Sequence, residues 1–158
     1  IDAHFIEQMI PHHEDAITMA ELALDKAEHE EIKQLARDIQ RTQTAEIEKM
    51  QAWHKEWFGR EVVAYLIQKA HAHMEGMGMH MGMMGDGTDL EALENAKPFD
   101  KEFIKQMIPH HQMAVMMAQM LKQSTNRPEM KQLAEDIIVA QTKEINQMRE
   151  WYRLWYVR

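Results

Sequence analysis

The stretch FIEQMIPHH at residues 5–13 returns almost unchanged as FIKQMIPHH at residues 103–111. Around it, residues 2–58 align with residues 100–156 without a gap, and 26 of the 57 aligned positions are identical. An ungapped match of this length indicates that the chain contains two copies of one structural unit.

Each copy predicts two amphipathic helices. Apolar residues recur at three- and four-residue steps, as one face of a helix requires. In the second half of the first copy these residues are Ile32, Leu35, Ile39, Ile47, Met50, Trp53 and Trp57. Asp2 and Asp100 are expected to be N-caps. Breaks near residues 26–30 and at STNRPE, residues 124–129, mark the turns, so each copy is a helical hairpin.

The segment between the copies, residues 59–99, exceeds an ordinary loop and is predicted to cross the length of the bundle, as in ferritin-like folds. Its first part, residues 60–73, is expected to be helical or to adhere to the bundle, whereas five glycines among residues 75–87 favour a flexible, exposed loop. The prediction is an all-α, ferritin-like four-helix bundle in one domain, built from hairpin 2–58, this connector and hairpin 100–156.

Composition excludes several classes of protein. The 158 residues carry a net charge of -8 and contain no cysteine, so thiolate metal sites and redox thiols are excluded. No basic stripe offsets the negative charge, which argues against nucleic acid as a partner. No apolar run reaches the length of a membrane span. Because the chain enters a helical pattern at its first residue, a periplasmic or secreted protein whose signal peptide has been removed is expected.

Methionine is unusually abundant, with 16 Met against only nine Leu in the same chain. The connector contains HAHMEGMGMHMGMMG at residues 71–85, where Met alternates with Gly or His and has little to pack against. Thioethers select Cu(I) and its soft surrogate Ag(I), and imidazoles also accept Cu(II). The candidate ligands in the connector are His71, His73, Met74, Met77, Met79, His80, Met81, Met83 and Met84. A hydrophobic loop that binds a protein partner is the alternative.

The MIPHH element places a proline and two histidines inside each first helix, where the proline is expected to cause a kink. Only one histidine of each adjacent pair is expected to face inward, since neighbouring positions differ by about 100° on a helix. Hairpin geometry places Gln43, Glu46 and Met50 opposite the first pair. Two interpretations stay open, a buried His–Glu network that specifies the bundle and a metal site. The candidate ligands are Met9, His12, His13, Glu46 and Met50, with their equivalents Met107, His110, His111, Glu144 and Met148.

Several other conspicuous residues have structural interpretations. Met113, Met116, Met117 and Met120 follow helical spacing and are predicted to pack in the core, as is Met19. The four Trp are predicted to pack in the core or at the ends of the bundle. His29 and His54 have no histidine at the equivalent position of the second copy, and both are predicted to lie on the surface.

Catalysis is not expected. A di-iron carboxylate site needs Glu-x-x-His, and no histidine of this chain has Glu three positions before it. Met-x-x-His occurs instead, at Met9/His12, Met77/His80 and Met107/His110. Blue copper needs a cysteine, and no Ser-His-Asp set, phosphate loop or HExxH motif is present. The alternatives to metal binding are a ferritin-like metal-dependent oxidase and a helical interaction module without metal.

The pattern FIxQMIPHHxxAxxMA, followed by LAxxI, QxxEIxxM and a Trp, resembles the ferritin-like exported domain-of-unknown-function family numbered three hundred and five. Both hairpins match it. The resemblance implies a periplasmic or secreted four-helix bundle that binds copper and limits its toxicity. Together with the ligand chemistry, we expect a non-enzymatic protein that sequesters Cu(I), and also Cu(II), for copper resistance or for handover to a copper-exporting or copper-accepting protein.

Overall fold

A computed structural model describes residues 1–62 and 88–158 of the chain. Its regular structure in these ranges is helical. The elements are α1 (Asp2–Lys26), α2 (Glu30–Phe58), α4 (Leu90–Asn95), α5 (Phe99–Ser124) and α6 (Pro128–Tyr156). The two turns fall where the sequence predicts them, so α1–α2 and α5–α6 form the two predicted hairpins.

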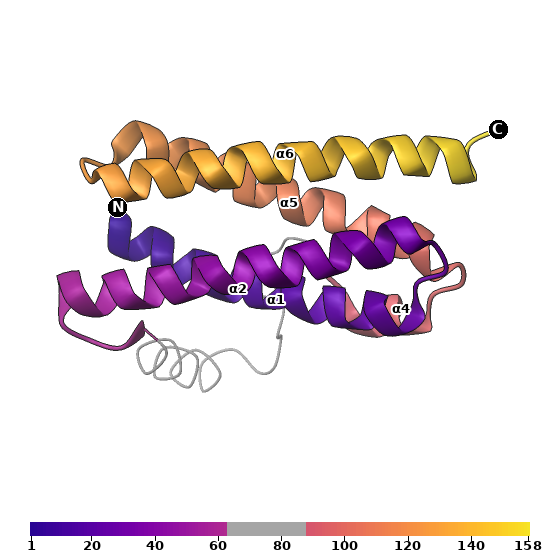
Figure 1. The fold of residues 1–158 in the computed structure, drawn as a ribbon, viewed down its shortest axis with the longest axis horizontal. Coiled ribbons are helices and arrows are strands. Elements are labelled where there is room, and N and C mark those ends of the chain that lie inside the picture. The colour runs from indigo at the N-terminus through magenta and orange to yellow at the C-terminus, as the bar shows by residue number, and fades with distance from the viewer. Residues whose placement is uncertain (63–87) are drawn as a thin grey trace, which may run out of the picture.

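The hairpins join through their first helices (Figure 1). α1 packs on α2 and α5 packs on α6, while α1 and α5 form the main contact between the hairpins. α2 and α6 lie on the near side of this view and run in opposite directions, without extensive packing on each other. The prediction of an all-α four-helix bundle made of two duplicated hairpins is confirmed.

The core consists of two apolar clusters, and each draws on both hairpins. One combines Met19 and Ile32 with Phe103. The other combines Ile10 with Ile137. Because burial of apolar surface is the main driving force of folding, clusters shared in this way hold the two repeats together. Along α1 the second cluster ends at Ile10 and the first begins at Ala16, and the MIPHH histidines lie between them.

Helix ends follow local rules at some positions and depart from prediction at others. The residue after α2, Gly59, is its C-cap and has the left-handed conformation that glycine adopts without strain. α4 was not anticipated, although Asp89 caps it by accepting a hydrogen bond from Ala92 N–H at 3.0 Å. The predicted N-caps Asp2 and Asp100 are wrong, because α1 begins at Asp2 itself and α5 begins one residue before Asp100.

The turn of the second hairpin is held by the first. Arg127, which precedes α6, lies with its Cζ 4.1 Å from the centre of the Trp57 ring. Its Nε donates to Asp2 Oδ2 at 3.1 Å. Trp57 lies at the end of α2 and Asp2 at the start of α1. A guanidinium that meets both an aromatic face and a carboxylate stabilises the contact between the repeats.

The turn of the first hairpin is held by the second in the same way. His29 is the repeat equivalent of Arg127, and its ring stacks on Trp155 with centroids 3.6 Å apart. Asp100 accepts hydrogen bonds from the backbone N–H groups of Glu28 and His29, at 3.0 and 2.8 Å, and from His29 Nδ1. Its carboxylate therefore holds the turn that precedes α2 in the other hairpin, which accounts for the burial of Asp100.

We expect Asp100→Ala to lower the free energy of unfolding by about 2 kcal/mol, because it orphans two backbone donors in the partly buried turn before α2. Asp2→Ala is the matched control from the other repeat. Its carboxylate is more exposed and meets a half-exposed Arg127, so the expected loss is about 1 kcal/mol or less. Urea unfolding measures both, and equal losses would contradict the role of Asp100 in holding this turn.

Two side-chain predictions are wrong. Met116 and Met120 are 50% and 59% exposed on α5, so these two are not core, whereas Met117 packs against the second cluster and Met113 is partly buried. His54 is fully buried, where a surface position is predicted, while the His29 side chain is 33% exposed. Met19 and the four Trp pack in or against the clusters, as predicted.

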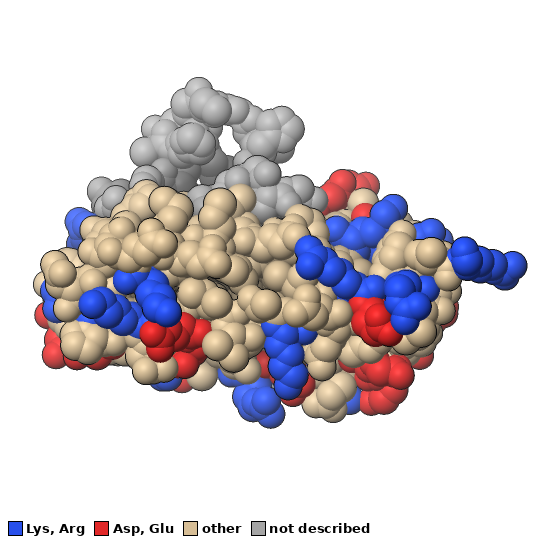
Figure 2. All heavy atoms as spheres, turned by 90° about the horizontal axis from the view of Figure 1, so that it is seen from above, with Lys and Arg blue, Asp and Glu red and all other residues tan. Residues whose placement is uncertain are grey.

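The connector prediction lies largely outside the described residues, since residues 63–87 are not described. No helix among residues 1–62 and 88–158 is long and apolar enough to cross a membrane. On the face shown in Figure 2, acidic and basic groups are interspersed and no continuous basic stripe forms.

Candidate metal centre

Four histidines meet between the two apolar clusters. His12, His13, His110 and His111 are all buried, in the middle of α1 and α5, the two helices that join the hairpins. The rings of His12 and His110 stack across this contact, with centroids 3.6 Å apart and planes inclined by 19°. The expectation that only one histidine of each pair faces inward is wrong, because each pair lies between several helices and both directions lead into protein.

The second histidine of each pair is held by a carboxylate from the following helix. His13 Nε2 lies 3.5 Å from Glu46 Oε2, and His111 Nε2 lies 3.0 Å from Glu144 Oε2. The hairpin register predicted from the sequence is therefore confirmed in both copies. A carboxylate that is ionised can only accept, so each Nε2 carries the hydrogen of the bond.

The other nitrogen of these two rings faces the protein interior. In the neutral imidazole, a hydrogen on Nε2 leaves the lone pair on Nδ1. The Nδ1 atoms of His13 and His111 are buried and have no hydrogen-bond partner within the described part of the chain. A buried lone pair without a partner is costly, and coordination of a metal ion is one way to satisfy it.

Sulfur and amide groups surround the histidines. Met9, Met50, Met107 and Met148 are fully buried. Met9 and Met107 each precede the two histidines of their helix by one turn, so thioether and imidazole share a face. Gln43 and Gln141 are buried one turn before Glu46 and Glu144. Met9 and Met50 belong to the cluster of Ile10, whereas Met107 and Met148 belong to the cluster of Phe103, so the thioethers are buried on both sides of the histidines.

Burial disfavours the charged form of His110. Burial, together with the neighbouring imidazoles of His12, His111 and His13, holds the pKa of His110 well below its ordinary value. A neutral imidazole keeps a lone pair for a metal ion, whereas an imidazolium has none.

The lowered pKa of His110 predicts a loss of stability in acid. As pH falls through about 6.5, the unfolded chain binds a proton at this residue and the folded chain does not. Its contribution is therefore a fall of up to about 1.4 kcal/mol per pH unit below that point and no change above it. Urea unfolding from pH 7.5 to 5.5 should show a shallower fall in His110→Gln than in the unaltered chain. Exposed His4→Gln is the control, and equal slopes in all three proteins would contradict the prediction.

The structure does not describe one part of the predicted site and shows no complete ligand set in the other. The connector ligands, from His71 to Met84, lie outside the described residues. Among the residues that are described, no three His, Asp or Glu side chains are arranged to hold a metal ion. A site in the bundle would therefore depend on the thioethers as well.

Sequence reasoning missed a fifth buried histidine, His54. His54 is fully buried, with Nε2 3.1 Å from Glu7 Oε1 and Nδ1 3.1 Å from the Arg60 carbonyl oxygen. The second copy has Lys105 and Tyr152 at the positions of Glu7 and His54, so comparison of the repeats gave no signal. The helical spacing of His54 from Met50 and Ile47 was the one available indication of burial.

The sequence pattern of a protein family, described as a domain of unknown function (DUF305), matches residues 2–152. The chain belongs to the DUF305 family. It is similar to CopM in the Cu(II)-bound form, at 55% identity and a TM-score of 0.86, over 98% of this chain and 97% of that chain. CopM has also been solved in Cu(I)-bound and Ag-bound forms, which match at TM-scores of 0.83 and 0.82.

Two further proteins show how far the likeness extends. A Streptomyces coelicolor DUF305 protein, whose name describes it as a candidate secreted protein, is 29% identical at a TM-score of 0.77, over 95% of this chain and 90% of that chain. The uncharacterized protein L153 of Acanthamoeba polyphaga mimivirus is 49% identical over 49 residues, which are 31% of this chain. The match spans 32%, about a third, of that curated relative.

Proposed function

We propose that this DUF305 protein binds Cu(I), and also Cu(II) and Ag(I), as cargo through Met and His, without catalysing a reaction. Its role would be to sequester copper outside the cytoplasm, in the periplasm or as a secreted protein, for copper resistance or for handover to an exporting or accepting protein. Residues 2–58, 59–99 and 100–156 would act as one domain. The 55% identity to CopM, which is known in Cu(II)-, Cu(I)- and Ag-bound forms, supports the choice of metal.

The proposal rests on the hydrogen bonding of His13 and His111. Each donates Nε2–H to a glutamate and has a buried Nδ1 without a hydrogen-bond partner in the described residues. Histidines that bind metal ions commonly donate their other ring nitrogen to a carboxylate, which fixes the tautomer and orients the ring. We therefore assign Glu46 and Glu144 the task of holding these rings, with the metal at Nδ1.

The remaining donors fit a soft monovalent ion. Met9, Met50, Met107 and Met148 supply neutral thioethers, and His12 and His110 supply neutral imidazoles at the contact between the hairpins. Cu(I) and Ag(I) prefer such ligands to the oxygen-rich sets of iron oxidases. Neutral donors also leave the positive charge of the ion uncompensated, which favours release to a partner. The connector set, His71, His73, Met74, Met77, Met79, His80, Met81, Met83 and Met84, would capture copper with the same chemistry.

The test is an anaerobic Cu(I) titration against a chromophoric competitor, with three full-length proteins compared: the unaltered chain, a variant without residues 71–84, and His13→Gln with His111→Gln. Circular dichroism checks that each is folded. We expect the deletion to retain one class of tight site and the double substitution to lose it. Tight binding that survives the double substitution but vanishes with the deletion would assign copper to the connector and leave the buried His–Glu pairs as structural elements. No competition by any of the proteins would refute copper binding altogether.

A further inference from the structure

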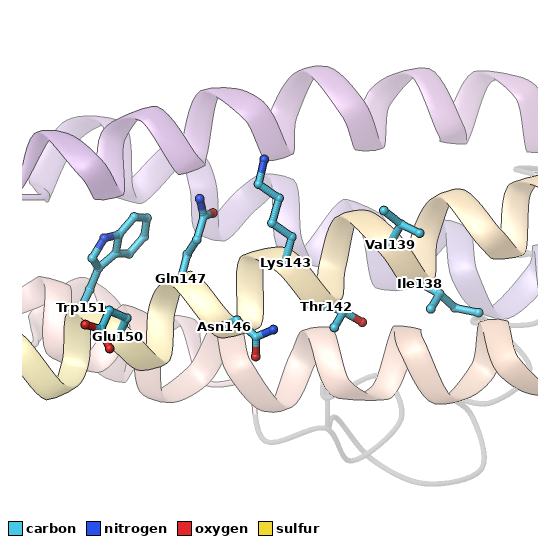
Figure 3. Close-up of a pocket in the computed structure, with 8 residues that line it drawn as sticks. All are labelled: Ile138, Val139, Thr142, Lys143, Asn146, Gln147, Glu150 and Trp151. Carbon is cyan, nitrogen blue, oxygen red and sulfur yellow. The ribbon is translucent and has the colours of Figure 1, made fainter.

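A groove runs along the surface between α2 and α6, the two helices that lie side by side without extensive packing. Its volume is about 960 Å³, and both helices line it. Figure 3 shows Lys143 and Gln147, two of the α6 residues that line this groove, with their side chains extending toward α2. Because α2 and α6 are equivalent helices of the two repeats that run in opposite directions, the groove lies across the approximate twofold relation of the molecule.

Glu46 and Glu144 connect this groove with the buried histidines. Both line the groove, and their side chains are 9% and 14% exposed. Both also contact fully buried imidazoles, His13 and His111. Among the described groove residues, these two are the ones with a recorded hydrogen bond to a histidine of the cluster. One layer of side chains therefore separates the groove from the candidate metal centre.

The charge of the groove suits a cation. It is lined by six carboxylates and three basic side chains, and the acidic excess would raise the local concentration of positive ions. The acidic residues are Glu31, Asp38, Glu46, Glu135, Asp136 and Glu144, and the basic ones are Arg41, Lys49 and Lys143. Carboxylate oxygen is a hard donor that holds Cu(I) weakly, so these groups can gather the ion without trapping it.

We propose that the α2/α6 groove is the route by which copper enters and leaves the buried centre, with Glu46 and Glu144 as the positioning residues at its floor. Each carboxylate meets the incoming ion and must release its histidine ring before the ion can pass to the interior. This inference rests on the proposed function. It predicts that the groove controls the rate of exchange, whereas the buried thioethers and imidazoles set the equilibrium affinity.

The experiment fills the groove and leaves its carboxylates in place. Ala45 and Ala140 line the groove, so Ala45→Trp with Ala140→Trp narrows it. Ala52→Trp with Ala92→Trp is the matched control, because both alanines are exposed and lie outside the groove. Stopped-flow absorbance follows the transfer of Cu(I) from each full-length protein to a chromophoric chelator. The kinetic phase that is absent in the double variant His13→Gln with His111→Gln is assigned to the bundle site.

We expect the groove variant to exchange Cu(I) at least about tenfold more slowly in both directions, with a Kd within about threefold of the unaltered chain. The control pair should exchange at the unaltered rate. Unchanged rates in the groove variant would overturn the route even if copper binding is intact. If the double tryptophan variant does not fold, Asp38→Asn with Asp136→Asn provides the second test, since loss of two groove carboxylates should slow capture at low salt. Equal capture rates at low salt would again overturn it.

Discussion

Replacing Met9 and Met107 by leucine should weaken Cu(I) binding in the bundle by about 100-fold or more while the fold is retained. Loss of groups that merely orient metal ligands commonly costs about 10- to 100-fold in affinity, and loss of two ligands should exceed that. Leucine has nearly the volume of methionine, so each exchange in the core costs less than about 1.5 kcal/mol of stability. Competition titration with a Cu(I) chelator on the full-length variant measures the affinity.

The chain offers a matched control for this prediction. Met19 and Met130 are also fully buried in the two apolar clusters, but Met19 lies six positions after His13 and Met130 lies 14 positions before Glu144, so neither is one turn from a residue of the centre. Met19→Leu with Met130→Leu should therefore leave the affinity unchanged and alter stability by a similar amount. If both pairs weaken Cu(I) binding equally, the effect arises from general packing and the buried thioethers are not ligands.

The second large effect concerns stability. His54→Ala should lower the free energy of unfolding by about 3–5 kcal/mol, because it leaves the carboxylate of Glu7 buried with its main partner removed. The two ring nitrogens of His54 each lie 3.1 Å from an oxygen, Glu7 Oε1 and the Arg60 carbonyl, so the substitution removes both of these contacts and a packed ring together. Urea unfolding at pH 7.5 measures the loss.

A paired replacement separates the buried charge from the lost volume. Glu7→Met with His54→Leu removes both partners and fills the space, so it should recover most of the stability lost in His54→Ala. The exposed pair of Lys55 and Glu61 is the comparison, since Lys55→Ala should cost about 0.5 kcal/mol or less. A double variant as unstable as His54→Ala would show that the hydrogen bonds, rather than the unpaired charge, dominate.

The sequence predicts the framework because duplication doubles each signal. The hairpin register that places Glu46 opposite His13 also places Glu144 opposite His111, and both pairs are present. Turn residues and helical periodicity likewise occur twice. Features repeated in both hairpins were therefore predictable from residue patterns, whereas the His54–Glu7 pair, which occurs in the first hairpin alone, was missed.

Contacts between the hairpins were not predictable in the same way. Asp100 is predicted to be the N-cap of its own helix, yet it binds the turn before α2, 71 or 72 positions away along the chain. Met116 looked like a core residue because helical spacing does not reveal which face of α5 another helix covers. The stacking of His12 on His110 also depends on how α1 crosses α5, which no pattern within one hairpin specifies.

The reciprocal contacts of the two turns bear on how the chain can be rearranged. Arg127 is held by Asp2 and Trp57, and its equivalent His29 is held by Asp100 and Trp155. Neither set requires that the first hairpin precede the second. A circularly permuted chain that begins at residue 88 and joins residue 158 to residue 1 through a linker should therefore build the same bundle. Its linker would need to span the length of the molecule, since the two ends lie at opposite ends of the bundle (Figure 1).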